Sequence, residues 1–141
     1  GQTSKRYAGA SNSPLAMADA RCPLWQIHRG FDRPGDMATQ LVELEDGTRW
    51  FTFASTVRPQ GVLMSGGHPE FVVALGLEAS VAAPLALARG VDLTGGAAMS
   101  VGLGCRNCTR PDCAQRAAPP KGRTLMFNER ERGLSPFSFG D

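Results

Sequence analysis

The middle of the chain alternates between apolar segments and turn signals, a pattern typical of β-strands joined by short loops. Residues 37–45 alternate between apolar and polar side chains, and residues 50–57 are rich in aromatic and β-branched residues. Asp46-Gly47 lies between them and favours the turn of a β-hairpin, because both central residues of that turn need positive φ. The pattern therefore predicts a hairpin, followed by strands at residues 70–77 and 100–104.

Helical signals occur before and after these strands. Leu24, Ile27 and Phe31 recur at i, i+3 and i+7, so residues 23–31 are predicted to form a short amphipathic helix that begins at Pro23. A second helix is expected from Ser13-Pro14, a third over residues 78–89 with an interruption at Pro84, and one helical turn over residues 111–117. Hairpin strands with a few helices indicate an α+β domain, with one antiparallel sheet covered by helices on one face.

Composition describes an ordinary globular chain. Of the 141 residues 42% are hydrophobic and 20% are charged, which suits one domain with a real core. We expect a flexible leader over residues 1–12, a ligand-sensing domain over 13–123 and an extended tail over 124–141. The opening residues contain no signal peptide, no initiator methionine and no membrane-spanning run, so the sequence reads as an excised piece of a longer cytoplasmic protein. The net charge of +2 argues against a stand-alone nucleic-acid binder.

The clearest chemical signal is a cluster of cysteines. Cys105, Cys108 and Cys113 follow C-x2-C-x4-C spacing, which can turn several sulfurs toward one metal ion. A tetrahedral site needs a fourth donor, and Cys22 is preferred because it completes a uniform thiolate set. His28 and His68 are the substitutes. The pattern predicts a structural zinc site, with an iron–sulfur cluster as the alternative metal centre.

Two other interpretations of the cysteines stay open. Cys105 and Cys108 form a CxxC pair that a thiol redox sensor or oxidoreductase would use, although Cys113 would then be idle. Buried free thiols are the second interpretation. An enzyme is disfavoured, because the glycine pairs match no nucleotide-binding pattern and Ser65 near His68 lacks an acidic partner.

Two segments resemble one known family. Residues 21–25, RCPLW, and residues 104–120, GCRNCTRPDCAQRAAPP, are similar to signatures in the C-terminal domain of short-chain fatty acyl regulators. These are bacterial transcription factors with an XRE-type helix-turn-helix, and the resemblance covers residues 13–123. It implies a sensory module that responds to acyl-coenzyme A or a related metabolite. DNA would be read by an N-terminal helix-turn-helix that this chain lacks.

The resemblance also implies a ligand with phosphate groups. Arginine side chains bind phosphates well, and the candidates are Arg29, Arg33, Arg106 and Arg116. The sequence does not choose among them, and it leaves open whether the module forms a homodimer. A membrane partner is not expected.

Overall fold

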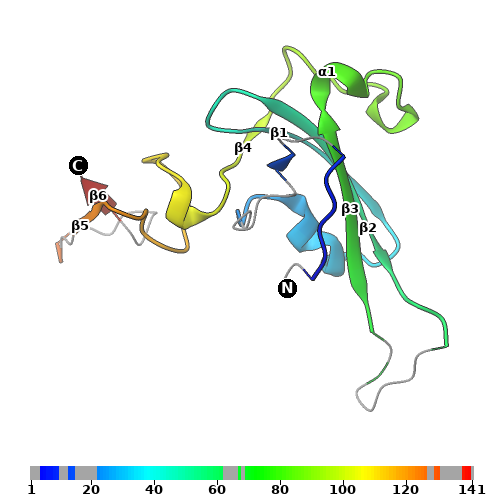
Figure 1. The fold of residues 1–141 in the computed structure, drawn as a ribbon, viewed down its shortest axis with the longest axis horizontal. Coiled ribbons are helices and arrows are strands. Elements are labelled where there is room, and N and C mark those ends of the chain that lie inside the picture. The colour runs from blue at the N-terminus through cyan, green and yellow to red at the C-terminus, as the bar shows by residue number, and fades with distance from the viewer. Residues whose placement is uncertain are drawn as a thin grey trace.

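The computed structural model describes residues 4–9, 13–14, 22–61, 67, 69–126, 129–130 and 138–140. Its centre is a four-stranded sheet in the order β3-β2-β1-β4 (Figure 1). The strands are β1 (Met37–Glu43), β2 (Arg49–Val57), β3 (Phe71–Glu78) and β4 (Met99–Ser100). The predicted helix that begins at Ser13-Pro14 lies mostly outside the described residues, as does His68.

The sheet is mixed. β1, β2 and β3 form an antiparallel meander, whereas β4 runs parallel to β1 with Val42 opposite Met99. The expectation of an antiparallel sheet is correct for three strands and wrong for the fourth. The physical reason is the long connection over residues 79–98, which brings the chain back beside the end of β1 running in the same direction as β1.

The predicted hairpin between β1 and β2 forms, but the predicted turn geometry is wrong, because Gly47 has positive φ and Asp46 does not. Gly47 adopts a φ of 80°, the Leu44 N–H donates to the Thr48 carbonyl at 2.9 Å, and the Gly47 N–H donates to the Leu44 carbonyl at 3.1 Å. Asp46 Oδ1 accepts hydrogen bonds from both the backbone N–H and the hydroxyl of Thr48. Local turn chemistry therefore fixes the register that places Val42 opposite Trp50.

One face of the sheet packs against η2 (Gln26–Asp32), a 3-10 helix that begins three residues after the predicted start at Pro23 and ends one residue after the predicted end at Phe31. The Gln40 side chain holds the start of η2, since its Nε2 donates to the Leu24 carbonyl and its Oε1 accepts from the Gln26 N–H, both at 2.9 Å. Gly30 of η2 lies directly against Val72, where an added Cβ would lie 2.6 Å from Cγ2. The buried cluster on this face contains Cys22, Trp25, Val42, Leu44, Trp50 and Val101.

The other face is covered by α1 (Ala79–Ala82) and η3 (Ala86–Ala88), which pack on Phe51. Phe51 follows Trp50 in β2, and successive side chains of a strand point to opposite faces, so the sheet has a core on each side. The expectation of helices on one face only is therefore wrong. The predicted helix over residues 78–89 is divided, because Pro84 cannot donate the hydrogen bond that continued helix would require.

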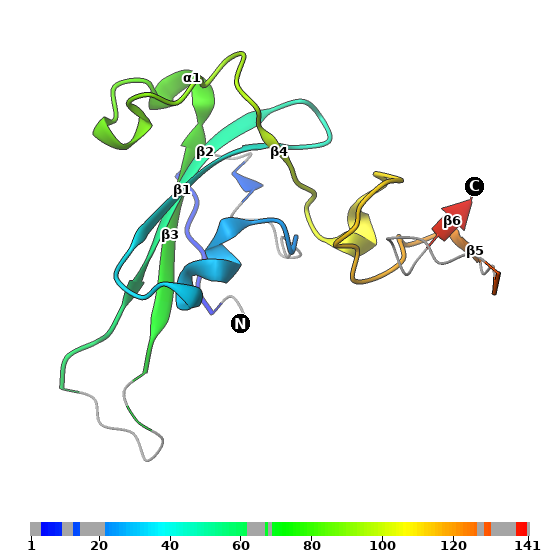
Figure 2. The ribbon, with the colours of Figure 1, turned by 180° about the vertical axis from the view of Figure 1, so that it is seen from behind.

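After β4 the chain leaves the sheet and enters the cysteine knuckle, residues 104–117. One helical turn, η4 (Cys105–Asn107), opens the knuckle, and a backbone hydrogen bond from Arg116 to Cys113 closes it at 3.1 Å. The prediction of a helical turn over residues 111–117 is wrong, because the helical turn of the knuckle lies at residues 105–107. β5 (Thr124–Met126) and β6 (Ser138–Gly140) form a separate antiparallel pair beyond the knuckle, away from α1 (Figure 2). The proposed boundaries at residues 12 and 123 remain predictions.

No helix within the described ranges is long and apolar enough to cross a membrane.

Candidate functional site

Gly102 stands where the sheet meets the cysteine knuckle. The Cys22 sulfur accepts a hydrogen bond from the backbone N–H of Gly102. A Cβ added to Gly102 would lie 2.8 Å from both Cβ and Sγ of Cys108. Gly102 therefore lies between the first cysteine of the chain and the third, and only a residue without a side chain permits both contacts.

Cys22 also lies close enough to Cys105 and Cys113 for their charges to affect its pKa. Burial raises the pKa of the Cys22 thiol above its usual value, backbone hydrogen bonds from Gly102 and Leu24 lower it, and the charges of Cys105 and Cys113 raise it further. Cys22 is therefore close enough to Cys105 and Cys113 for their charges to interact.

Cys108 occupies the interior of the knuckle. Burial raises the pKa of its thiol most strongly, a backbone hydrogen bond from Arg110 lowers it, and the Glu45 carboxylate raises it again. Arg116 and Arg110 oppose this rise through their positive charge. A buried thiol with a raised pKa is a poor nucleophile, so this environment gives no support to a reactive CxxC pair.

The four cysteines are free thiols. Across the described ranges, however, no three His, Cys, Asp or Glu side chains are grouped closely enough to hold an ion. The imidazole of His28 donates to the backbone carbonyl of Cys22, and burial is the main reason that the His28 pKa is lowered. The cysteines thus share one neighbourhood, while the closed metal site stays a prediction.

Arg116 is the structural centre of the knuckle. Only 3% of the residue is exposed, and its Nη1 donates to the carbonyls of Cys105 at 3.4 Å and Cys108 at 3.3 Å. Its Nη2 donates to the Arg110 carbonyl, and the guanidinium lies 4.8 Å from the centre of the Phe139 ring. Since no carboxylate in the described part pairs with Arg116, the recorded partners of this buried cation are three carbonyls and a ring.

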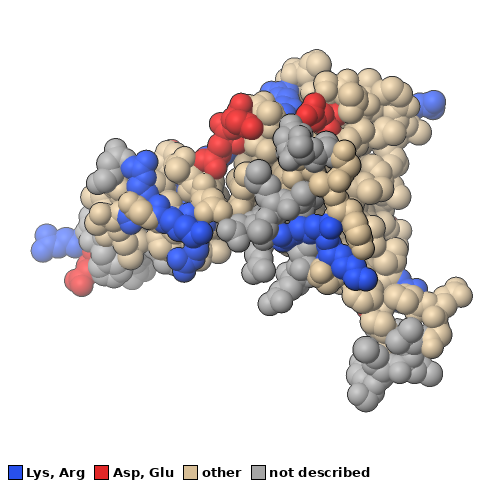
Figure 3. All heavy atoms as spheres, in the orientation of Figure 1, with Lys and Arg blue, Asp and Glu red and all other residues tan. Residues whose placement is uncertain are grey.

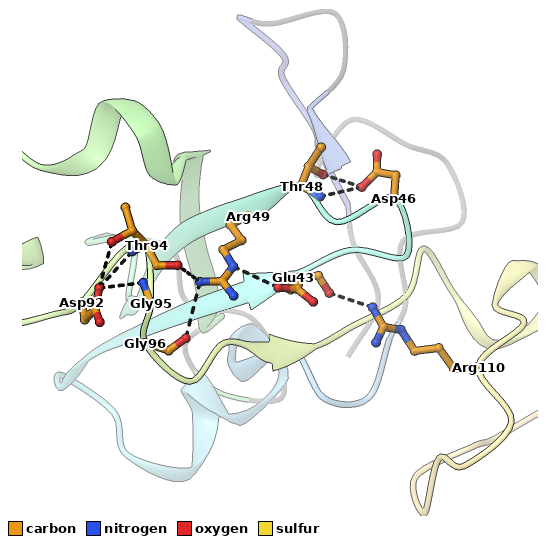
Figure 4. A network of polar contacts seen from close by, with 9 residues as sticks. All are labelled: Glu43, Asp46, Thr48, Arg49, Asp92, Thr94, Gly95, Gly96 and Arg110. Carbon is orange, nitrogen blue, oxygen red and sulfur yellow. Dashed lines mark hydrogen bonds and ion pairs between the residues drawn. The ribbon is translucent and has the colours of Figure 1, made fainter.

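Two acidic residues attach the knuckle to the sheet. Glu45 Oε1 accepts hydrogen bonds from the backbone N–H and the hydroxyl of Thr109, both at 2.8 Å. The backbone carbonyl of Glu43 accepts from Arg110 Nη2 at 3.1 Å, and its side chain pairs with Arg49 Nε at 2.9 Å (Figure 4). No spacing in the sequence marks Glu43 or Glu45, because both act across long sequence separations.

The same network continues to the loop over residues 92–96. Arg49 Nη1 donates to the backbone carbonyls of Thr94 and Gly96 (Figure 4). Asp92 Oδ1 accepts from the backbone N–H groups of Thr94 at 3.1 Å and Gly95 at 2.8 Å, which closes the loop. The cysteine knuckle is thereby connected to the loop over residues 92–96 through Glu43 of β1 and Arg49 of β2.

Two shallow clefts flank Arg110 and Pro111. The first has a volume of about 370 Å³ and lies toward the hairpin, where Glu43, Glu45 and Thr109 line it. The second has a volume of about 390 Å³ and combines apolar Leu24 and Met99 with knuckle residues that include Cys113. Both volumes fall in the range of small-molecule sites.

The candidate phosphate ligands do not share one location. Arg29 and Arg33 are exposed on and just after η2, Arg106 is exposed on the knuckle, and Arg116 is buried within it. Basic side chains gather over the lobe formed by the knuckle and the β5–β6 pair, and acidic side chains gather near the hairpin (Figure 3). Of the four candidates, Arg106 is thus the exposed one on the knuckle itself.

The two segments whose sequences resemble the C-terminal domain of short-chain fatty acyl regulators lie just before η2 and over the cysteine knuckle. A family model described as "Short-chain fatty acyl coenzyme A regulator, C-terminal" matches residues 1–137. The chain therefore belongs to this family and represents its C-terminal domain, which confirms the resemblance seen in the sequence.

Three curated relatives are also named as regulators. The chain is 34% identical over 141 residues to the propionyl-CoA carboxylase regulator of Cereibacter sphaeroides, covering 100% of this chain and 30% of the relative. It is 34% identical over 140 residues to the HTH-type transcriptional regulator RamB of Mycobacterium tuberculosis (97% of this chain, 29% of the relative). The HTH-type transcriptional regulator PrpR of the same species is 32% identical over 139 residues (98% and 28%).

A solved structure shares the fold. A "Mycobacterium tuberculosis transcriptional regulator" superimposes with a TM-score of 0.75 at 34% sequence identity, covering 83% of this chain and 36% of that one. The chain spans less than a third of the length of the curated relatives described above. Those relatives are named as regulators and not as enzymes, in agreement with the expectation that this chain is not an enzyme.

Proposed function

We propose that this chain is the ligand-sensing domain of a cytoplasmic transcription regulator, and that a short-chain acyl-coenzyme A or a related metabolite is its signal. The observation that carries the proposal is the family match over residues 1–137, which includes both signature segments. The names of RamB and PrpR assign a helix-turn-helix to those proteins. DNA binding by this protein would likewise depend on a part outside the chain.

We further propose that Cys22, Cys105, Cys108 and Cys113 hold a structural metal, with zinc as the expected ion. Two features of the site fit this assignment. The Gly102 N–H already donates to the Cys22 sulfur, as donors do to metal thiolates. The buried Arg116 guanidinium would offset part of the negative charge that four thiolates leave on a divalent ion.

The metal would act by fixing the shape of the knuckle. Four thiolate ligands close a tetrahedral zinc site, and its binding free energy becomes folding free energy. Arg116 and Glu45 would then transmit that rigidity, because the first binds three knuckle carbonyls and the second binds Thr109. The knuckle would thus form one rigid side of a ligand site, and its metal would be structural and not catalytic.

The cleft beside Cys113 supports the ligand proposal. Its apolar residues, Leu24 and Met99, suit a short acyl chain, and its volume of about 390 Å³ matches the acyl and adjoining part of such a molecule better than a complete coenzyme A. The phosphates would lie outside it, where exposed Arg106 is the nearest candidate in the sequence of the knuckle.

A ligand in this cleft would contact both strand β4 and the cysteine knuckle, and we propose that the signal is a change in the position of one relative to the other. Met99 belongs to β4, and Arg110 belongs to the knuckle and binds the Glu43 carbonyl of β1. A ligand that binds better to one arrangement of knuckle and sheet shifts the population toward that arrangement. The rest of a longer regulator would read this shift.

Ligand binding is tested by thermal shift with acetyl-, propionyl- and butyryl-coenzyme A, against free coenzyme A as control. Specific binding raises the melting temperature with ligand concentration. The effect should be lost in Met99→Glu, which places a charge in the apolar wall, and retained in Met126→Glu, which alters an exposed methionine on β5. No shift with any acyl thioester would refute ligand sensing without affecting the family assignment.

A further inference from the structure

The two shallow clefts beside the cysteine knuckle share one charged residue, Arg110, which lines both of them. Its side chain is half-buried, and its Nη2 donates to the backbone carbonyl of Glu43 at 3.1 Å (Figure 4). Among the described residues no carboxylate forms an ion pair with this guanidinium. Arg110 therefore brings to the clefts a positive charge that no described carboxylate neutralises.

One hydrogen-bond donor of Arg110 is also unused. Its Nε is shielded from solvent and has no acceptor within the part of the chain that the structure describes. A buried donor without an acceptor costs free energy, which a suitable acceptor would recover. An unpaired charge and an unpaired donor on one side chain together suit an oxyanion, because a guanidinium binds a carboxylate or a phosphate through two parallel hydrogen bonds.

The acidic residues of the clefts decide on which side of Arg110 an anion would bind. Glu43 and Glu45 both line the cleft toward the hairpin, where their negative charges would repel an anion. The lining of the other cleft, beside Cys113, includes Asp112, which is exposed to solvent, so water and salt screen its charge. An anion is therefore favoured in the cleft beside Cys113.

The cleft beside Cys113 also has an apolar part. Leu24 and Met99 contribute to its lining, and its volume is about 390 Å³. Leu24 packs against the buried cluster around Trp25, which holds this part of the lining in place. A carboxylate that carries a short alkyl chain matches both the guanidinium and the apolar side chains, whereas an inorganic phosphate matches the guanidinium alone.

Arg110 can turn toward such a ligand without leaving the sheet unpaired. The Glu43 carbonyl also accepts a hydrogen bond from the Val101 N–H at 2.9 Å, so it keeps a partner when Arg110 moves. The move would remove one contact between the knuckle and the hairpin strands, while the contact of Glu45 with Thr109 stays. Binding of a carboxylate is thereby linked to the contact between the knuckle and the sheet.

We propose that Arg110 is an anion-binding residue, and that the cleft lined by Arg110, Leu24 and Met99 takes a carboxylate with a short alkyl chain. The inference rests on the proposed ligand-sensing function and names the chemistry of the signal. Two sources share this chemistry. One is a free short-chain acid, and the other is a coenzyme A thioester whose acyl chain ends in a carboxylate.

The test is solution NMR of the 141-residue chain, following the Arg110 Nε–H and Met99 methyl signals during titration. The first pair of ligands is propionate and its neutral analogue propionamide. The second pair is glutaryl-coenzyme A, which carries a free carboxylate, and butyryl-coenzyme A, which does not. We expect saturable shifts of both signals with propionate or with glutaryl-coenzyme A. The neutral member of the pair that binds should be weaker by about tenfold, because it cannot form charge-assisted hydrogen bonds.

The ligands separate the possible outcomes. Shifts with propionate identify the free acid as the signal, and shifts with glutaryl-coenzyme A alone identify the carboxylated thioester. Butyryl-coenzyme A that binds as tightly as glutaryl-coenzyme A, with no effect of propionate, would overturn the role of Arg110 and leave ligand sensing intact. Inorganic phosphate that binds as tightly as the carboxylate, or no shift with any of these ligands, would also overturn the proposal.

Substitutions of Arg110 provide a second test. Arg110→Gln keeps a donor for the Glu43 carbonyl but removes the charge, and it should weaken carboxylate binding by about tenfold or more. Arg110→Lys keeps the charge and loses the paired donors, so it should lie between the two. Arg89→Gln is the matched control, since Arg89 is exposed after η3 and lines neither cleft, and it should bind as wild type does. Unchanged carboxylate binding in Arg110→Gln would contradict the proposal.

Discussion

A methyl group on Gly102 would collide with the sulfur of Cys108, since the two atoms would lie 2.8 Å apart. The same residue donates its backbone N–H to the sulfur of Cys22. Gly102 therefore couples the position of the third cysteine to that of the first. Its φ is not in the left-handed region, so the requirement for glycine comes from space and not from backbone conformation.

Gly102→Ala should destabilise the domain by about 1–3 kcal/mol, the usual range for forcing an extra methyl group into a packed site. Urea unfolding of the two proteins measures the difference. Gly9→Ala is the control, because an added Cβ there meets nothing within 4 Å, and it should be neutral. Equal stability of Gly102→Ala and wild type would show that Cys108 does not lie against Gly102.

Glu45 is expected to hold the knuckle on the hairpin. Glu45→Ala removes the acceptor of two hydrogen bonds from Thr109 and should cost about 1–2 kcal/mol, which is modest because the site is exposed to water. Hydrogen exchange of the Thr109 amide should accelerate in the variant. Glu129→Ala, at an exposed position near the C-terminus, should change neither quantity.

Arg116 should tolerate no substitution, including lysine. A lysine keeps the charge but cannot reproduce the fork that reaches the carbonyls of Cys105, Cys108 and Arg110. Arg116→Lys should destabilise the domain by about 2–4 kcal/mol, in proportion to the loss of several hydrogen bonds from a buried charge. Arg106→Lys, on the exposed side of the knuckle, should have the stability of wild type in the same chemical denaturation experiment.

Asp92 gives a prediction about pH. Backbone hydrogen bonds from Gly95 and then Thr94 hold the pKa of Asp92 below its usual value. Because the folded-state pKa is lowered, the stabilisation is present above the unfolded-state pKa and is lost as the pH falls through the folded-state pKa. Asp92→Asn should remove this part of the acid dependence when stability is measured from neutral pH downward.

Asp46 provides the comparison for that experiment. Hydrogen bonds from the Thr48 side chain and then its backbone lower the pKa of Asp46 in the same way. Asp46 and Asp92 share no hydrogen-bond partner, so the acid dependence removed by Asp46→Asn and Asp92→Asn should add in the double variant. A clearly non-additive result would mean that the two turns unfold together.

The hairpin and the cysteine set show what the sequence could establish. Asp46-Gly47 fixes a turn through chemistry confined to a few residues, and the predicted hairpin is confirmed, although only Gly47 of the two has positive φ. Cys22 is grouped with the distant cysteines because a tetrahedral metal site needs four ligands. In the structure Cys22 lies close enough to Cys105 and Cys113 for their charges to raise its pKa. Local spacing is sufficient for the hairpin, whereas a metal site shared by the four cysteines remains a prediction.

Long-range contacts of polar side chains were not predictable in the same way. Gln40 binds both Leu24 and Gln26, and Glu43 joins Arg49 to Arg110, although neither residue belongs to a recognisable pattern. The parallel β4 is only two residues long and is held by one further hydrogen bond, from the Val101 N–H to the Glu43 carbonyl at 2.9 Å. The position of β4 depends on the next residue, Val101, which packs with Val42 and Trp50, and a local pattern does not contain such contacts.

Metal analysis of the purified chain, alongside its visible absorption spectrum, tests the four-cysteine centre most directly. The account predicts about one zinc per chain in protein prepared without added metal, its loss in Cys22→Ser and Cys108→Ser, and destabilisation of both variants by several kcal/mol. Strong visible absorption with bound iron and sulfide would keep the four ligands and replace zinc by an iron–sulfur cluster. A metal-free protein whose melting curve is unchanged in Cys108→Ser would contradict the centre itself.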